Sequence, residues 1–359
     1  MSQYPKAEIS WFSALCDDDY QFLGVEDPSL KASWPHCRDI ALMAEKKGFD
    51  NILLPSGYTL GMDSIGFAGG IAPLLEKIRL LVAVRCGEMW VPQLARQLAT
   101  LDQMLGGRLT INIISSDLPG QTLDGGPRYQ RTREIMQALR MFLNGEAVHV
   151  DGEHIQLDLE PPRMQTVSGK CPPFYFGGLS PAARDVAAQE ADVFLMWPDT
   201  MDKVSDILDD MRQRASGYDR TLKFGYRAHV IVRETEEQAR AAADTLISKL
   251  DDGVGEEIRN RSLDSASYGV RRQAEMRDAA NAAGSGDYVE ENLWTGVGRA
   301  RSGCGAAIVG DPDQVLAKLN AYRELGIEAF ILSGYPHQDE CDLFGKYVLP
   351  KIDHGALEI

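Results

Sequence analysis

Two residues able to hold an anion stand close together in a strand-like segment. Arg227 and His229 lie two apart within the apolar run 223–232, so on a strand both side chains face the same side. Facing a core, this pair would need a carboxylate partner or an anionic ligand, because burying an unpaired charge is costly. Facing outward, it would pair with polar groups of neighbouring helices. The spacing therefore indicates either an anion site or a structural pair.

A second polar cluster follows the last strand-like run, 329–333. Tyr335 offers a hydroxyl donor and His337 an imidazole that titrates near neutral pH, with Pro336 between them. An ordinary turn would contain the same residue types. Trp197 closes another strand-like run, where it would either wall a planar cofactor or plug the end of the sheet.

The segment 175–181 combines glycines with the residues of a helix start. Ser180 is suited to the N-cap and Pro181 to the first helical position. Free N–H groups at such a start bind phosphate, although an ordinary cap has the same sequence.

A glycine-flanked basic segment, 298–303, contains Arg299 and Arg301. Such a loop would close over an anion and deliver positive charge as water leaves, or else remain a solvated basic loop. The sequence leaves both readings open.

Eight short apolar runs, alternating with helical patterns, must position these residues. The alternation is typical of βα units around a parallel sheet, and no strand is followed by a dinucleotide-binding glycine turn. We therefore predict an α/β fold, a closed (β/α)8 TIM barrel, with an open doubly wound sheet as the alternative. The strands are expected at 8–12, 50–54, 79–85, 109–115, 173–177, 193–197, 223–232 and 329–333.

Helices are expected between these strands wherever apolar residues recur at helical spacing. Gly48, Gly106, Gly217 and Gly326 stand where C-terminal helix stops belong. The expected helices are 35–47, 91–105, 128–144, 181–191, 201–216, 236–250 and 312–325.

Two stretches exceed a minimal barrel, and we expect both within a single domain spanning 1–359. Residues 145–172 predict a small hairpin with strands at 147–150 and 155–159. Residues 252–310 form a long polar insertion with a glycine-rich end, a length typical of lids or disordered segments. We expect a mobile lid there, before the last strand.

Composition excludes several classes of protein. The net charge of −16 argues against binding nucleic acid or an anionic membrane, although arginines inside a pocket can still hold an anionic substrate. The six cysteines contain no CxxC pair, and no metal-binding motif is present. The chain also lacks an apolar signal segment and a run near the ~20 apolar residues that a membrane span needs. We expect a cytoplasmic protein without a metal.

Taken together, these segments resemble the bacterial luciferase-like flavin monooxygenases, specifically the alkanesulfonate monooxygenase branch. The resemblance runs over nearly the whole chain. It implies a (β/α)8 barrel that uses reduced FMN and O2 to convert an organosulfonate to sulfite and an aldehyde. Relatives form dimers or tetramers, and the lack of an NAD(P)H motif implies a separate NAD(P)H-dependent flavin reductase. The most specific stretches are 175–180, 224–235, 292–311 and 332–337.

The resemblance also implies roles for individual residues. The sulfonate and the reacting end of the flavin would lie among a set of five residues, and Arg301 would belong to the closing lid. Tyr129 and Ser180 would hold the flavin phosphate, and Asn112 would lie beside the isoalloxazine. The set of five is Trp197, Arg227, His229, Tyr335 and His337.

Two departures from the family pattern bear on the substrate. Leu60 takes the place of a family cysteine in the loop after the second strand, and residues 15–19 are acidic where the family is more basic. A sugar sulfonate is a plausible variant. The alternatives are a sulfone, an amine or another non-sulfonate substrate, hydride transfer through deazaflavin, or a flavin-binding barrel without catalysis.

Overall fold

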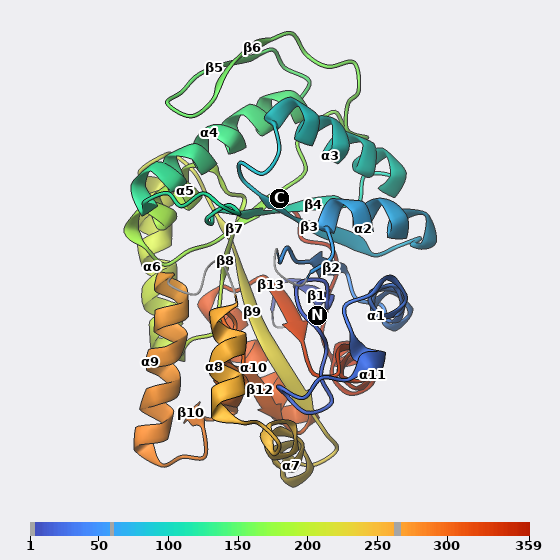
Figure 1. The fold of residues 1–359 in the computed structure, drawn as a ribbon, viewed down its shortest axis with the longest axis vertical. Coiled ribbons are helices and arrows are strands. Elements are labelled where there is room, and N and C mark those ends of the chain that lie inside the picture. Colours follow the sequence, from blue (N-terminus) through green and yellow to red (C-terminus); the bar gives the residue numbers. More distant parts are fainter. Residues whose placement is uncertain (1–3, 58–60, 262–266) are drawn as a thin grey trace.

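A closed barrel of parallel strands forms the centre of the molecule. The computed structural model describes residues 4–57, 61–261 and 267–359. Within these ranges eight parallel strands close on themselves, because β8 and β13 both pair with β9 and β13 also pairs with β1 (Figure 1). The closed barrel is confirmed over the open sheet. The strands are β1 (Glu8–Phe12), β2 (Asn51–Leu54), β3 (Arg79–Arg85), β4 (Leu109–Ile114), β7 (Phe174–Phe176), β8 (Val193–Met196), β9 (Lys223–Val232) and β13 (Ala329–Ser333).

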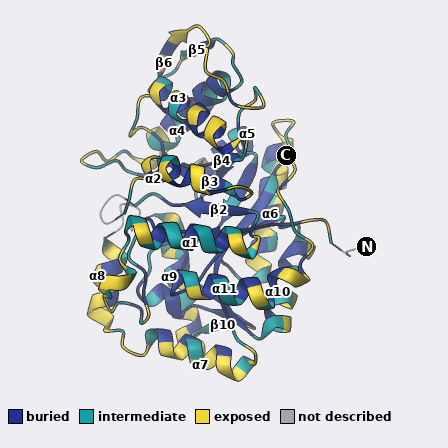
Figure 2. Cartoon of the chain, turned by 90° about the vertical axis from the view of Figure 1, so that its right-hand side faces the viewer, coloured by how far each residue is buried: buried dark blue, intermediate teal, exposed yellow. Residues whose placement is uncertain are grey.

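Helices surround the barrel with their apolar faces inward and their polar faces in solvent (Figure 2). Seven lie where the periodicity predicts them. Two others, α2 (Ser64–Ile71) and α11 (His337–Tyr347), were not predicted. The predicted seven are α1 (Trp34–Lys47), α3 (Val91–Leu105), α4 (Gly125–Leu143), α5 (Pro181–Glu190), α6 (Met201–Ser216), α7 (Glu236–Ile247) and α10 (Pro312–Leu325).

The glycine stops behave as expected at three of four positions. Gly48, Gly106 and Gly326 adopt the left-handed conformation that ends a helix. Gly217 does not, since its φ is −64°. The positive φ after α6 falls instead on Asp219, at 54°, because the chain continues for two more residues before it turns.

The predicted hairpin forms as β5 (Val148–Asp151) and β6 (Gln156–Leu159), which pair antiparallel. It projects beyond α3 and α4, at the end of the molecule opposite α7 (Figures 1 and 2). The Glu134 carboxylate of α4 holds the turn by accepting hydrogen bonds from the backbone N–H groups of residues 153, 154 and 155 at 2.8–3.0 Å.

The second insertion is more ordered than the sequence suggested. It contains α8 (Asp252–Asn260), α9 (Tyr268–Ala283), β10 (Tyr288–Glu290), β11 (Leu293–Trp294) and β12 (Ala307–Gly310). β9 is long enough to pair with β8 and β13 along its first part and with β12 at its end. Its first part pairs with β13 up to His229, and its last residues, from His229 to Val232, pair with β12.

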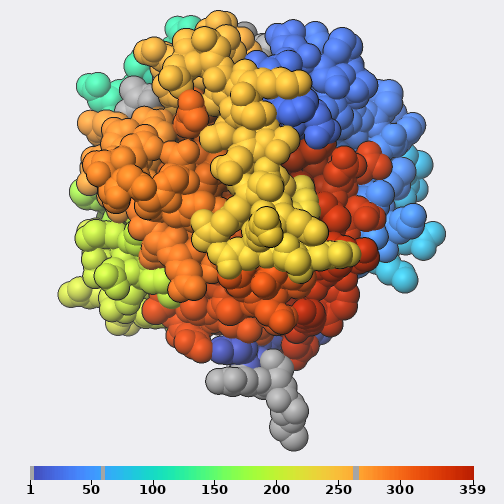
Figure 3. Space-filling view, turned by 90° about the horizontal axis from the view of Figure 1, so that it is seen from below, coloured from blue at the N-terminus to red at the C-terminus, as the bar shows by residue number. Residues whose placement is uncertain are grey.

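The loop after β1 and the second half of the chain meet at one end of the molecule. The backbone N–H of Leu23 donates to the carbonyl of Leu246 in α7 at 2.7 Å, and Tyr20 packs in the same apolar cluster. The surface at this end consists mainly of later residues, with the blue N-terminal segment beside them (Figure 3). None of the helices in the described ranges has both the length and the apolar composition of a membrane span.

Candidate active site

Arg227 and His229 face the inside of the barrel. Residues two apart share a face of β9, and the pairing register places Ile331 beside Arg227 and Ser333 beside His229. Both side chains are buried, with exposed fractions of 3% and 1%. Arg227 Nη2 donates to Ser333 Oγ at 2.8 Å, and the same oxygen lies 2.8 Å from His229 Nδ1. One serine therefore joins the arginine to the histidine.

Arg227 has no ion-pair partner among the described residues. Its other hydrogen bonds go to backbone carbonyls, including that of Ala228 at 2.6 Å. Burial lowers the pKa of this guanidinium, and the positive charge of Arg301 acts in the same direction. Because the starting pKa is so high, the group remains charged at neutral pH. An uncompensated buried cation favours an anionic ligand.

Arg301 approaches the same place from the second insertion. The guanidinium carbons of Arg227 and Arg301 lie 4.2 and 5.8 Å from the ring centre of Phe12. Arg301 Nη2 lies 3.3 Å from Cys16 Sγ, and Nη1 lies 3.8 Å from a carboxylate oxygen of Asp17. Although burial opposes its charge, Tyr335, Cys16 and Asp17 raise the pKa of Arg301. Two cations thus lie close to one aromatic ring.

His229 is a neutral imidazole packed against Tyr335. Burial lowers the pKa of His229 well below its usual value, and the charges of Arg227 and Arg301 lower it further. The two rings stack with centroids 5.2 Å apart. Burial raises the pKa of the Tyr335 phenol, which keeps its proton. His229 Nε2 is buried without a hydrogen-bond partner in the described part of the chain.

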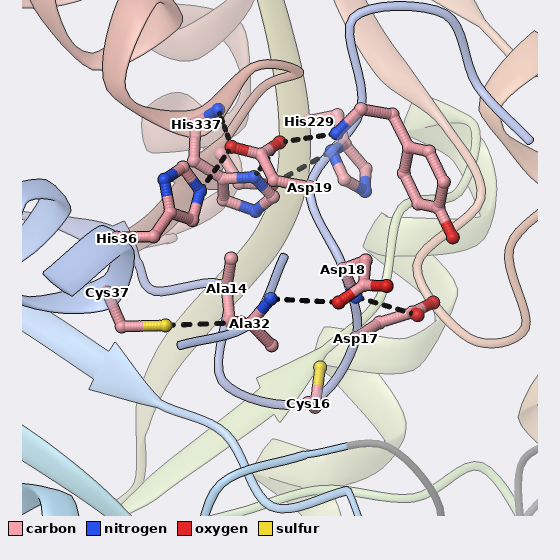
Figure 4. Close-up of polar contacts among 12 residues, drawn as sticks. Ala14, Cys16, Asp17, Asp18, Asp19, Ala32, His36, Cys37, His229 and His337 are labelled. Carbon is pink, nitrogen blue, oxygen red and sulfur yellow. Dashed lines mark hydrogen bonds and ion pairs between the residues drawn. The ribbon is translucent and has the colours of Figure 1, made fainter. Parts of the chain in front are cut away.

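His337 is fixed by a carboxylate from the loop after β1. Asp19 accepts hydrogen bonds from His337 Nδ1 and from the His337 backbone N–H, both at 2.8 Å, and lies 3.0 Å from His36 Nε2 (Figure 4). Burial works against the ionised carboxylate, but these bonds and the charge of His337 hold the pKa of Asp19 well below its usual value. His337 Nε2 has no partner among the described residues.

Six of the predicted site residues line a cavity of about 290 Å³. Arg227 lies in the middle of β9 and still reaches the cavity, so the cavity extends down into the barrel mouth. His229, Tyr335 and His337 do not line the cavity; they form a buried layer that touches Arg227 through Ser333. Leu60 lies outside the described residues. The six are Asn112, Tyr129, Ser180, Trp197, Arg227 and Arg301.

Several lining residues were missed by sequence reasoning. Cys16 reaches the cavity from the early loop, and Arg128 lies beside Tyr129 at the start of α4. Tyr268, at the start of α9, also lines it. The acidic loop was noted as unusual, but nothing local indicated that Asp19 would meet His337.

One end of the cavity has the features of a phosphate cradle. A Cβ on Gly178 would lie 2.6 Å from the Ala183 Cβ and 3.5 Å from the Tyr129 hydroxyl, and one on Gly177 would collide with a carbonyl. Ser180 Oγ caps α5 by accepting from the Ala183 N–H at 3.3 Å. The helix start, a phenol hydroxyl and the nearby Arg128 fit the phosphate of a flavin mononucleotide.

Trp197 lines the cavity and contacts the second insertion. A Cβ on Gly269 or on Gly303 would lie 2.9 or 3.1 Å from its ring, so the insertion backbone packs directly on the indole. The indole therefore packs against the insertion and contributes to the cavity wall.

Comparisons with known proteins identify the family and agree with the fold. The family described as luciferase-like monooxygenase matches residues 21–329. A sulfoquinovose monooxygenase of Novosphingobium aromaticivorans is 62% identical over 359 residues, covering 98% of each chain. Another, from Agrobacterium fabrum, is 52% identical over 354 residues, 98% of this chain and 91% of its own. The solved structure of DmoA from Hyphomicrobium sulfonivorans, 18% identical, shares the fold with a TM-score of 0.76 over 97% of this chain and 88% of its own. The chain belongs to the luciferase-like monooxygenase family.

Proposed function

We propose that this protein is a two-component monooxygenase that uses reduced FMN and O2 to cleave the C–S bond of an organosulfonate, with a sugar sulfonate as the leading substrate. The observation that carries the proposal is the charged, buried guanidinium of Arg227 on the cavity wall, with no carboxylate partner among the described residues. The names of the two similar relatives support a sulfonate over other anions.

The proposed reaction conserves atoms and charge. A sulfonate R–CH2–SO3⁻, O2 and FMNH2 give an aldehyde R–CHO, sulfite, water, FMN and one proton. One oxygen atom of O2 enters the aldehyde and the other leaves as water. When bound, the reduced flavin supplies the two electrons that activate O2.

The residues of the chain would bind and orient the reactants. Arg227 and Arg301 would hold sulfonate oxygens, because guanidinium groups present paired donors to such anions. Trp197 would wall the substrate side, and Asn112 would lie beside the flavin ring. Tyr129, together with Arg128 and the cap residue Ser180, would hold the phosphate.

The buried layer of His229, Tyr335 and His337 would hold protons near the reacting oxygens. His229 is neutral, and the Nε2 atoms of His229 and His337 have no hydrogen-bond partner among the described residues, so each would bond to a ligand that reaches past the cavity wall into this layer. Tyr335, between the two rings at 5.2 and 5.0 Å, would donate its hydroxyl proton in a hydrogen bond to the bound oxygens.

The second insertion would act as a mobile lid. Arg301 joins it to the loop after β1 through Cys16 and Asp17, so opening would withdraw one of the two cations. Closure would exclude water while it completes the positive site.

The same proposal includes a partner enzyme and an oligomeric state. Reduced FMN would come from a separate NAD(P)H-dependent flavin reductase, and we expect a homodimer or homotetramer. All six cysteines are free thiols, which fits a reducing cytoplasm.

The test is sulfite release under a supply of reduced FMN. The protein would be assayed with a flavin reductase, NADH and short-alkyl, long-alkyl, aromatic and sugar sulfonates. We expect O2-dependent sulfite release, fastest with the sugar sulfonate. The absence of sulfite from every member of the panel, with reduced FMN demonstrably bound, would overturn the proposal.

A further inference from the structure

We propose that Ser333 is a positioning residue that holds His229 as a neutral imidazole with its proton on Nε2. The register of β9 and β13 places Ser333 directly beside His229, and its hydroxyl oxygen lies 2.8 Å from both Arg227 Nη2 and His229 Nδ1. Ser333 itself is fully buried, so no solvent competes for these bonds.

The direction of the hydrogen bonds follows from the donors present. A guanidinium can only donate, so Ser333 Oγ must accept from Arg227. The hydroxyl proton then needs an acceptor, and His229 Nδ1 is the remaining partner in the described residues. The serine therefore donates to Nδ1, which must carry a lone pair. The neutral ring has one proton, and it is placed on Nε2.

The opposite tautomer satisfies fewer groups. With the proton on Nδ1, the ring would donate to an oxygen that already accepts from Arg227, and the serine proton would have no described acceptor. His229 Nε2 would be a second unsatisfied group, since it is buried without a partner. The Nε2–H arrangement leaves one group open, a donor, and buried donors of this kind are rare without a ligand.

The open donor has a chemical meaning that rests on the proposed function. Arg227 and Arg301 supply positive charge in the same region, so a bound anion would present oxygen atoms there. A neutral Nε2–H donates a hydrogen bond to such an oxygen without adding another charge. Ser333 would thus make His229 a donor, not a base.

His337 provides the contrasting case inside the same molecule. Its Nδ1 lies 2.8 Å from Asp19 Oδ1, and a carboxylate can only accept. His337 must therefore carry a proton on Nδ1, whereas His229 must not. Both buried rings pack on Tyr335. Ser333 keeps Nδ1 of His229 unprotonated, whereas Asp19 keeps Nδ1 of His337 protonated.

Ring nitrogen chemical shifts test the assignment without any turnover. The full chain would be labelled with ¹⁵N-histidine, and its six histidines reduce the assignment to a few signals. Long-range ¹H–¹⁵N spectra at neutral pH, without flavin, would be assigned with H229N and H337N. We expect His229 Nδ1 to be unprotonated and His337 Nδ1 to be protonated. A protonated Nδ1 on His229 would overturn the proposal even if no variant of Ser333 folds.

Substitutions then test the role of the hydroxyl. S333A removes the donor to Nδ1, so His229 should become a mixture of tautomers. We expect a loss in kcat on the order of tenfold, the lower end of the loss seen when the group that orients a metal-bound histidine is removed. S333T keeps the hydroxyl and should restore the wild-type shifts. S10A is the matched control, since Ser10 is buried on the adjacent strand β1 and bonds to Glu8 instead. Unchanged His229 shifts in S333A would contradict the assignment.

The outcomes separate this inference from the proposed function. If the shifts match but no sulfonate is cleaved, the tautomer stands and the proposed function fails. If sulfite forms but His229 Nδ1 is protonated, the function stands and Ser333 has no such role.

Discussion

The carboxylate of Asp19 holds His337 at two points, the ring Nδ1 and the backbone N–H, each at 2.8 Å. These residues are 318 positions apart, and the contact joins the loop after β1 to the start of α11. It fixes both the ring orientation of His337 and the path of the chain where it leaves β13.

We expect Asp19→Asn to weaken both stability and activity. The amide keeps the shape of the side chain but removes the negative charge that both His36 and His337 contact. Breaking a buried pair costs about 3–5 kcal/mol. The free energy of unfolding, measured with urea at pH 7, should fall by this order. Asp206→Asn, on the exposed face of α6, is the control and should cost less than about 0.5 kcal/mol.

The same carboxylate predicts a pH dependence. The folded-state pKa of Asp19 lies below its unfolded value of about 3.9, so its stabilisation is complete above that pH and is lost as the pH falls toward the folded pKa. The stability gap between wild type and D19N should therefore narrow in acid. A gap that stays constant between pH 7 and pH 3 would contradict this account.

Arg227→Ala should abolish sulfite release while reduced FMN still binds within about tenfold. Removing one charge-assisted donor typically costs on the order of 10²–10³-fold in rate. Arg227→Lys should recover only part of it, because a single ammonium cannot reach Ser333 and the sulfonate together. Arg240→Ala, which breaks an exposed ion pair with Glu236 on α7, is the control and should leave turnover unchanged. Near-normal sulfite release by R227A would remove Arg227 from the site.

The barrel and the shared face of Arg227 and His229 were predictable because both depend on local periodicity, whereas the spacing left open whether that face is inward. Eight apolar runs give eight strands, and a spacing of two places Arg227 and His229 on one face. What sequence reasoning missed depends on long-range contact. Asp19 meets His337 only after the barrel closes, and β12 pairs with β9 only because that strand extends beyond its pairing with β8 and β13. The helices and strands of the second insertion were also not predicted, because their packing on Trp197 is a long-range contact that leaves no pattern in the local sequence.

Gly178→Ala should weaken flavin binding at the cradle. The new Cβ would lie 2.6 Å from the Ala183 Cβ, so the start of α5 must move, and it would also contact the Tyr129 hydroxyl at 3.5 Å. We expect at least a tenfold loss in FMNH2 affinity, measured by anaerobic fluorescence titration, and an overpacking cost of about 1–3 kcal/mol in stability. Gly125→Ala is the matched control, because a Cβ there meets nothing within 4 Å. Equal FMNH2 affinity in the two variants would place the phosphate elsewhere.

Arg301→Gln should raise the pKa of His229. In the wild type, burial and then the charges of Arg227, Arg301 and His337 depress that pKa, so the ring stays neutral well below pH 6.5. Glutamine removes one of these charges and keeps much of the side-chain volume. The pKa, followed through the ring ¹⁵N shifts as the pH is lowered, should move upward.

Arg299→Gln controls for the loss of a positive charge from the same segment, since Arg299 pairs with Asp252 at 2.9 Å instead of facing the cavity. It should leave the titration of His229 in place. The direction of the change in the His229 pKa decides the test, because a buried imidazole near cations gains a proton more readily when one cation is removed. Two outcomes would contradict this prediction: a His229 pKa that falls in R301Q, or one that moves equally in R299Q. Either would mean that the charge of Arg301 does not act on His229 and that the lid delivers this charge to another part of the cavity.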